Sequence, residues 1–129
     1  MIRTGNGLAA LVVSTALLMS PTSAWPQSEW KAPAEAKTLK NPVQGDGDAK
    51  KVIATSCAAC HGSSGRGDGV ASAALQPKPV DWSSAAVQSD TDGELFWKIT
   101  NGRGSMPAWR QLPETERWQI VNYIRSLRK

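Results

Sequence analysis

Residues 57–61 read Cys-Ala-Ala-Cys-His, and this motif constrains the chain more than any other feature of the sequence. At the end of a helix, cysteines at positions i and i+3 present both thiols on one face, with the imidazole of His61 directly after them. These are the only cysteines and the only histidine among 129 residues. A tetrahedral zinc site made from cysteine and histidine needs four such ligands, and a scaffold of several disulfides needs more cysteines. The sequence therefore excludes both.

The same motif predicts the covalent attachment of haem. Cys57 and Cys60 can each add to one vinyl group of a single porphyrin, which forms two thioethers, and His61 then offers a ring nitrogen to the iron. A dithiol redox pair of the thioredoxin type is one alternative, but it belongs to a βαβ unit that this sequence does not show. A short-loop disulfide is another. The position of the only histidine favours one covalently bound haem c.

The first 24 residues have the pattern of a secretory signal peptide. Arg3 gives a positive start, residues 8–19 are mostly apolar, and small residues precede a cleavage site after Ala24. A membrane-spanning helix needs about 20 apolar residues, so we expect cleavage, a periplasmic location and no stable membrane insertion. The net charge of +4 is too small and too scattered to indicate binding to nucleic acid.

Proline and helix signals organise the rest of the chain. Residues 25–45 contain three prolines and few apolar residues, which predicts an extended lead-in, and residues 46–129 form the expected domain. Helices are expected over 49–57, 70–75, and from a capping box at Thr91 and Glu94 to about Asn101. A further helix is expected over 114–127, where an apolar stripe recurs at three-residue spacing, formed by Trp118, Val121, Ile124 and Leu127. No segment alternates with period two. The sequence therefore predicts an all-α domain whose thin core needs a cofactor to fill it.

Met106 is the only methionine outside the predicted signal peptide, and it lies in a glycine- and proline-containing loop. A loop methionine beside a proline is poorly explained as core filler, whereas its soft thioether would favour ferrous iron and raise the reduction potential. His61 and Met106 are therefore the expected axial ligands of the haem iron. Because such an iron has no open position for substrate or oxygen, we predict electron transfer rather than an enzyme activity.

In this order, the motifs resemble those of class I c-type cytochromes, specifically the small soluble bacterial monohaem kind. The resemblance covers about residues 45–127 and rests on CAACHG (57–62), GRGDG (65–69), DGELFWKI (92–99), GSMPAW (104–109) and RWQIVNYIRSL (117–127). It implies short helices and long loops wrapped around one haem, with the first and last helices crossing closely. Ala49 and Tyr123 stand where the family usually has a glycine and an aromatic residue at that crossing.

The resemblance also implies contacts around the haem. A backbone carbonyl of Pro77 or Pro79 would accept a hydrogen bond from the His61 ring, which fixes its orientation. Trp97 would pack near the haem, and Trp97 or Arg103 would contact a propionate. Plain core packing is the alternative role for Trp97, since tryptophan is mostly buried bulk.

These observations predict an exported one-electron carrier. Its partners would be a periplasmic dehydrogenase or membrane oxidoreductase and a terminal oxidase or reductase, met as a monomer or in a weak complex. Three alternatives remain open at this point. They are a dedicated electron-transfer subunit of a dehydrogenase complex that docks through residues 30–43, a haem-based sensor or enzyme with a labile sixth ligand, and a thiol oxidoreductase.

Overall fold

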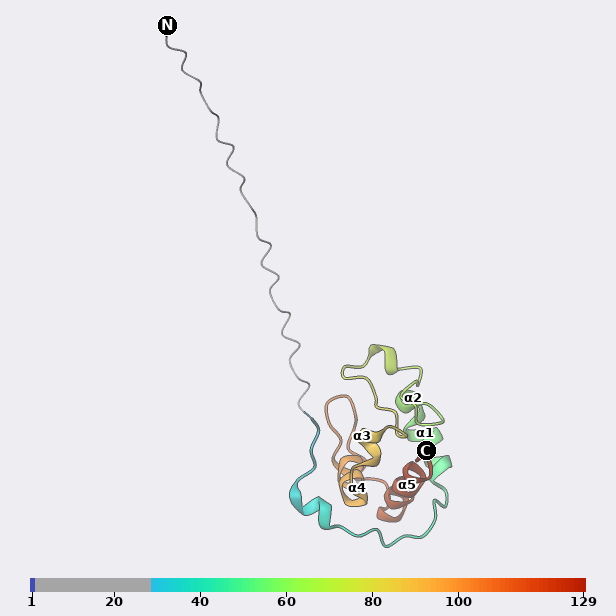
Figure 1. Cartoon of the computed structure of the whole chain (residues 1–129). Coiled ribbons are helices and arrows are strands. Elements are labelled where there is room, and N and C mark those ends of the chain that lie inside the picture. Colours follow the sequence, from blue (N-terminus) through green and yellow to red (C-terminus); the bar gives the residue numbers. More distant parts are fainter. Residues whose placement is uncertain (2–28) are drawn as a thin grey trace.

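The computed structural model describes Met1 and residues 29–129, so that nearly all of the predicted signal peptide lies outside the described residues. The elements in chain order are η1 (Ala34–Thr38), α1 (Ala49–Ser56), α2 (Ala58–His61), η2 (Ser72–Ala74), α3 (Ala85–Gln88), α4 (Asp92–Asn101) and α5 (Glu114–Ser126) (Figure 1). In this part of the chain the only β pairing is an isolated bridge between Arg103 and Met106, which confirms the all-α prediction. No helix between residues 29 and 129 is long and apolar enough to cross a membrane.

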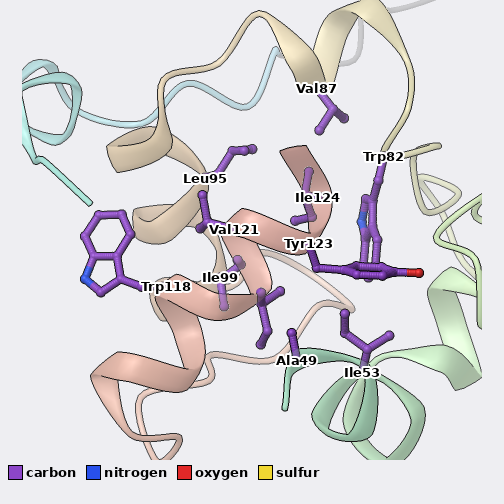
Figure 2. Packing of buried hydrophobic residues seen from close by; sticks show 11 residues of the cluster. Ala49, Ile53, Trp82, Val87, Leu95, Ile99, Trp118, Val121, Tyr123 and Ile124 are labelled. Atoms are coloured by element: carbon purple, nitrogen blue, oxygen red, sulfur yellow. The ribbon is translucent and has the colours of Figure 1, made fainter. Parts of the chain in front are cut away.

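Helix α5 is the centre of the core, and α1 and α4 both pack against it (Figure 2). Its inner face carries the predicted stripe, with Trp118, Val121 and Ile124 all buried. On α1, Ala49 is completely buried and lies in the same cluster as Tyr123, so that the crossing implied by the resemblance is confirmed. The small side chain at Ala49 lets the two helices approach closely even though it is not a glycine.

The capping box of α4 is present as predicted. The Thr91 hydroxyl accepts from the backbone N–H of Glu94 (3.2 Å), and the Glu94 carboxylate accepts from the backbone N–H of Thr91 (2.8 Å). This backbone hydrogen bond is the main cause that lowers the pKa of the buried Glu94 carboxyl below its ordinary value. One turn further along, the Phe96 ring stacks on Trp118, with centroids 3.9 Å apart, and ties α4 to α5.

The lead-in differs from the prediction. Residues 34–38 form the 3₁₀ helix η1, so the interpretation of residues 25–45 as extended is wrong for this part. The segment runs beside α4 before it reaches α1 (Figure 1), and Ala36 is only 1% exposed. This approach requires glycine at position 93, because a Cβ there would collide with the carbonyl oxygen of Ala36. Packing on α4, which local sequence does not reveal, therefore orders the lead-in.

One asparagine on α5 fastens the end of the lead-in. The Asn122 side-chain amide donates to the carbonyls of Val43 (3.0 Å) and Gly45 (2.6 Å), while its oxygen accepts from the Asn41 side chain (2.7 Å). The lead-in is thus held at two places, on α4 through η1 and on α5 through Asn122. Residues 29–45 are part of the folded domain rather than a tail.

Candidate functional site

The Cys-Ala-Ala-Cys-His motif forms a single helical turn. The backbone N–H of His61 donates to the carbonyl of Cys57 (2.9 Å), and Gly62, with φ of +75°, ends the turn directly after the histidine. Both cysteines are free in the structure. The structure therefore brings two thiols and one imidazole to the end of α2, as the spacing predicts.

These three side chains line a cavity of about 510 Å³. Ligand pockets for small molecules and cofactors have volumes of about 300–1,000 Å³, so the cavity is large enough for a cofactor. Its walls are mainly apolar and include core residues, among them Trp82, Ile99, Ile120 and Ile124. A second hollow of about 570 Å³ shares His61, Met106, Trp82 and Ile99 with the first. The two hollows are therefore adjoining lobes of one pocket, and both lobes are lined by His61 and Met106.

The environment of His61 suits a metal ligand. Burial lowers the pKa of His61 from its ordinary value, and the backbone of Val80 opposes this effect, so the imidazole is neutral at neutral pH. Neutral imidazole is the form that binds metal ions. Within residues 29–129, the buried Nδ1 atom finds no hydrogen-bond partner, whereas buried polar atoms of core residues are nearly always paired. A neutral imidazole that lines the same pocket as two thiols and a thioether fits the donor set of a haem site.

The expected hydrogen bond from the His61 ring to Pro77 or Pro79 is not formed at Nδ1. Both prolines line the pocket, so the predicted neighbourhood is correct. The Pro79 carbonyl lies instead against Gly67, where an added Cβ would collide with it. The backbone of Gly67 therefore packs closely against the Pro79 carbonyl.

Trp82, which no local pattern in the sequence indicates as a site residue, packs against His61. The two rings have centroids 4.8 Å apart with planes inclined by 32°, and Trp82 also meets Tyr123 edge-on at 6.4 Å (Figure 2). The backbone N–H of Trp82 donates to the carbonyl of Gly65 (2.8 Å), and a Cβ at Gly65 would collide with the Trp82 ring. The glycine loop thus lets the tryptophan reach the histidine.

The thiol environment argues against dithiol redox chemistry. Burial, and secondly the charge of Cys60, raises the pKa of the Cys57 thiol to about 11. Thiol–disulfide exchange proceeds through the thiolate, and catalytic cysteines of this kind have lowered pKa values. The thiol oxidoreductase alternative is therefore disfavoured by the structure.

Met106 is fixed by its backbone. Arg103 and Met106 exchange two hydrogen bonds across a tight turn, and the backbone N–H of Trp109 donates to the carbonyl of Ile99 (3.1 Å) at the end of α4. Gly102, with φ of +62°, allows the loop to fold back, because a Cβ at this position would collide with the Met106 carbonyl oxygen. The methionine side chain is partly buried against the core and lines both lobes of the pocket.

Of the two residues predicted to contact the haem or a propionate, Arg103 lines the pocket and Trp97 does not. Arg103 lines the pocket beside Met106. Trp97, on α4, is not among the described residues that line either lobe, so its contact with the haem stays a prediction. Besides Trp82, the pocket walls include Trp30 and Trp109, for which the sequence predicts no contact with the cofactor. Their only signal in the sequence is a high tryptophan content, six in 129 residues.

Solved structures show the class to which this fold belongs. A diatom cytochrome c6 from Phaeodactylum tricornutum is 20% identical, with a TM-score of 0.50, over 64% of this chain and 93% of its own. The c-type cytochrome KustC0563 is 22% identical, with a TM-score of 0.53, over 64% of this chain and 99% of its own. A chain of the Kuenenia stuttgartiensis reducing HAO-like protein complex Kustc0457/Kustc0458 is 25% identical, with a TM-score of 0.59, over 70% of this chain. This chain spans 47% of the length of that last protein.

Fold, attachment motif and pocket together define a c-type cytochrome, an electron-transfer haem protein with one covalently bound haem c. More than half of the sequence, residues 46–124, matches one family model, and the chain belongs to that family, described as cytochrome c oxidase, cbb3-type, subunit III. No curated protein matches the chain significantly. The fold and the cofactor predicted from the sequence are confirmed.

Proposed function

We propose that the chain is an exported, periplasmic one-electron carrier in which Cys57 and Cys60 hold the haem and His61 and Met106 are its axial ligands. The observation that carries the proposal is that His61 and Met106, far apart in the sequence, line the same two lobes of one pocket. When bound, the haem supplies a reversible one-electron change between ferric and ferrous iron.

The residues of the chain would keep both oxidation states in nearly the same geometry. Trp82 supports the neutral imidazole of His61 from the side, and the turn that starts at Arg103 holds the backbone of Met106. The thioether of Met106 favours the ferrous state and raises the potential. The apolar walls exclude water and lower the local dielectric, which has the same effect on a charged ferric centre.

An apolar rim supports contact with redox partners. Val80 lines both lobes of the pocket and yet is 54% exposed, so apolar surface reaches solvent at the mouth. Redox encounters bury little surface and are transient. The proposed electron donor is a periplasmic dehydrogenase or membrane oxidoreductase, and the proposed acceptor is a terminal oxidase or reductase. The chain would meet them as a monomer or in a weak complex.

The axial assignment is tested by Met106→Ala in the haem-loaded protein, with Ser105→Ala as control on the same loop. We expect the wild type and the control to show a low-spin spectrum with a sulfur-to-iron absorption band and no carbon monoxide binding at rest. Met106→Ala should lose this band, bind carbon monoxide and have a lower potential. An unchanged band and potential in Met106→Ala would refute the ligand, and carbon monoxide binding by the wild type would favour the sensor alternative.

A second candidate is a dedicated electron-transfer subunit of a larger redox complex. It is supported by the family description, which names an oxidase subunit, and by the Kuenenia neighbour, which belongs to a protein complex. Native gel electrophoresis of periplasmic and membrane extracts, stained for haem, separates the two functions. A band at the size of the single chain supports the carrier, and stable comigration with a larger species supports the subunit.

A further inference from the structure

We propose that Trp30, on the ordered lead-in, is a positioning residue that holds the Met106 loop in place over the haem pocket. This inference rests on the proposed function, since it concerns the residue assigned as the sixth ligand. Trp30 is partly buried and lines both lobes of the pocket, as His61 and Met106 do. Residues 29–38 are called the strap below.

The Trp30 ring is held by cations from two different elements. The Lys98 ammonium on α4 lies 5.6 Å from the ring centroid, and the Arg103 guanidinium of the Met106 loop lies 6.0 Å from it. Cations at such distances from an indole are attracted by its π electrons, and more strongly where water is excluded. The ring therefore connects α4 to the loop that carries Met106.

The Lys98 ammonium group on α4 is held in place by an ion pair. Lys98 donates to the Asp90 carboxylate at 2.6 Å, and both side chains are largely buried, with 17% and 20% exposed. Its ammonium group is therefore a fixed point under the Trp30 ring rather than a mobile surface charge.

The loop side is equally direct. Arg103 contacts Trp30 through its guanidinium and pairs its backbone with Met106 through two hydrogen bonds of 2.9 Å. A displacement of Arg103 would therefore move the backbone of Met106. Two interactions therefore connect the strap to the proposed ligand. The first is the contact between the Trp30 ring and the Arg103 guanidinium, and the second is the backbone pairing of Arg103 with Met106.

The strap itself is anchored independently of Trp30. Ala32 and Ala36 are buried, and η1 can lie on α4 only because residue 93 is a glycine. An ion pair between Lys37 and Glu94 (3.7 Å) adds to the same contact. The packing of η1 on α4 therefore places Trp30 at the pocket without any contribution from the Trp30 side chain itself.

The test uses the ferric haem-loaded protein and measures the rate of imidazole binding, which is limited by release of Met106. Trp30→Ala is compared with Trp30→Phe, which keeps a ring for the two cations, and with Lys40→Ala, an exposed change on the lead-in just after the strap. We expect imidazole to bind about tenfold faster to Trp30→Ala, because two cation–π contacts are lost. The sulfur-to-iron band should weaken, Trp30→Phe should restore most of the wild-type behaviour, and Lys40→Ala should match the wild type.

Gly93→Ala provides a second variant that leaves every residue lining the pocket unchanged. Alanine has a higher helix propensity than glycine, so the substitution stabilises α4 itself. The added Cβ collides with the Ala36 carbonyl oxygen and therefore forces η1 away from α4. Faster imidazole binding here as well would support the strap. Wild-type rates in Trp30→Ala and Gly93→Ala, with the sulfur band intact, would overturn the inference but leave the axial assignment standing. A wild type without the band would instead overturn the proposed ligand, and the inference with it.

Discussion

Arg103 and Met106 pair their backbones in both directions, each N–H donating to the other's carbonyl at 2.9 Å. The bridge closes a turn through Gly104 and Ser105 at the wall of the haem pocket. The backbone position of the proposed sulfur ligand is therefore set by a closed turn. The bridge depends on the chain reversing direction immediately after α4.

Gly102 and Gly104 provide a matched test of this turn. Both have positive φ, +62° and +56°, so alanine at either position costs about 1–2 kcal/mol of backbone strain. An added Cβ collides with the Met106 carbonyl oxygen at Gly102, whereas at Gly104 no atom of the described part of the chain lies within 4 Å of it. We expect Gly102→Ala to weaken the sulfur-to-iron band and lower the potential, while Gly104→Ala keeps both. Equal spectra in the two variants would contradict this account of the turn.

Gly65 and Gly45 form a second matched pair, for the support of His61. Their φ values are +72° and +71°, and a Cβ fits freely at Gly45 but collides with the Trp82 ring at Gly65. We expect Gly65→Ala to lower the free energy of unfolding by about 1–3 kcal/mol more than Gly45→Ala does, because Trp82 must shift in a packed core. Denaturant unfolding followed by haem absorbance measures the difference. Equal losses would show that Trp82 has room to move.

The capping box predicts a pH dependence of stability. Because the folded-state pKa of Glu94 is lowered, the carboxylate contributes stability at pH values above its ordinary pKa, and this contribution is lost as the pH falls through the folded-state pKa. Glu94→Gln keeps an oxygen for the Thr91 N–H but cannot titrate. The difference in unfolding free energy between wild type and Glu94→Gln should therefore be largest near neutral pH and shrink in acid.

Denaturant titrations at several pH values between about 7 and 3 measure this difference. Glu35→Gln, on the exposed side of η1, serves as the control for removing one negative charge. A wild-type to Glu94→Gln difference that stays constant down to the acid limit would be incompatible with a stabilising carboxylate at this cap.

Haem attachment is expected to be a condition for cooperative folding. The pocket of about 510 Å³ is bounded by core residues Ile99, Ile120 and Ile124, which otherwise face a void or water. Domains have only about 5–15 kcal/mol of net stability, so the loss of this much core contact is severe. The double variant Cys57→Ser with Cys60→Ser should lack a cooperative calorimetric transition, whereas the haem-loaded wild type shows one. A sharp transition without haem would refute this dependence.

Local signals in the sequence were sufficient for the longer elements. The apolar repeat of α5, the capping box of α4 and the helical turn of the Cys57–His61 motif are each decided by neighbouring residues, and each was predicted correctly. The predicted short helix near 70–75 is present as η2, Ser72–Ala74. For the same reason the attachment motif could be recognised without any knowledge of the fold.

Contacts between distant segments were beyond local reasoning. The four-residue helix α3 was missed; Gln88 at its end donates to the Ile124 carbonyl on α5 (2.8 Å), a contact from a remote part of the chain. The order in η1 likewise depends on Gly93, and the place of Trp82 depends on Gly65. Each of these glycines has a role that is visible only when its partner segment has been placed.

The spacing of the site along the chain has a consequence for biogenesis. The two thiols and the imidazole occupy one turn, Cys57–His61, whereas the pocket is completed by Met106, by α5 and by the strap. Covalent attachment of the porphyrin therefore requires only this short segment, whose helical turn forms from neighbouring residues. Haem attachment can therefore precede folding of the rest of the domain, and the later elements then close around the bound cofactor.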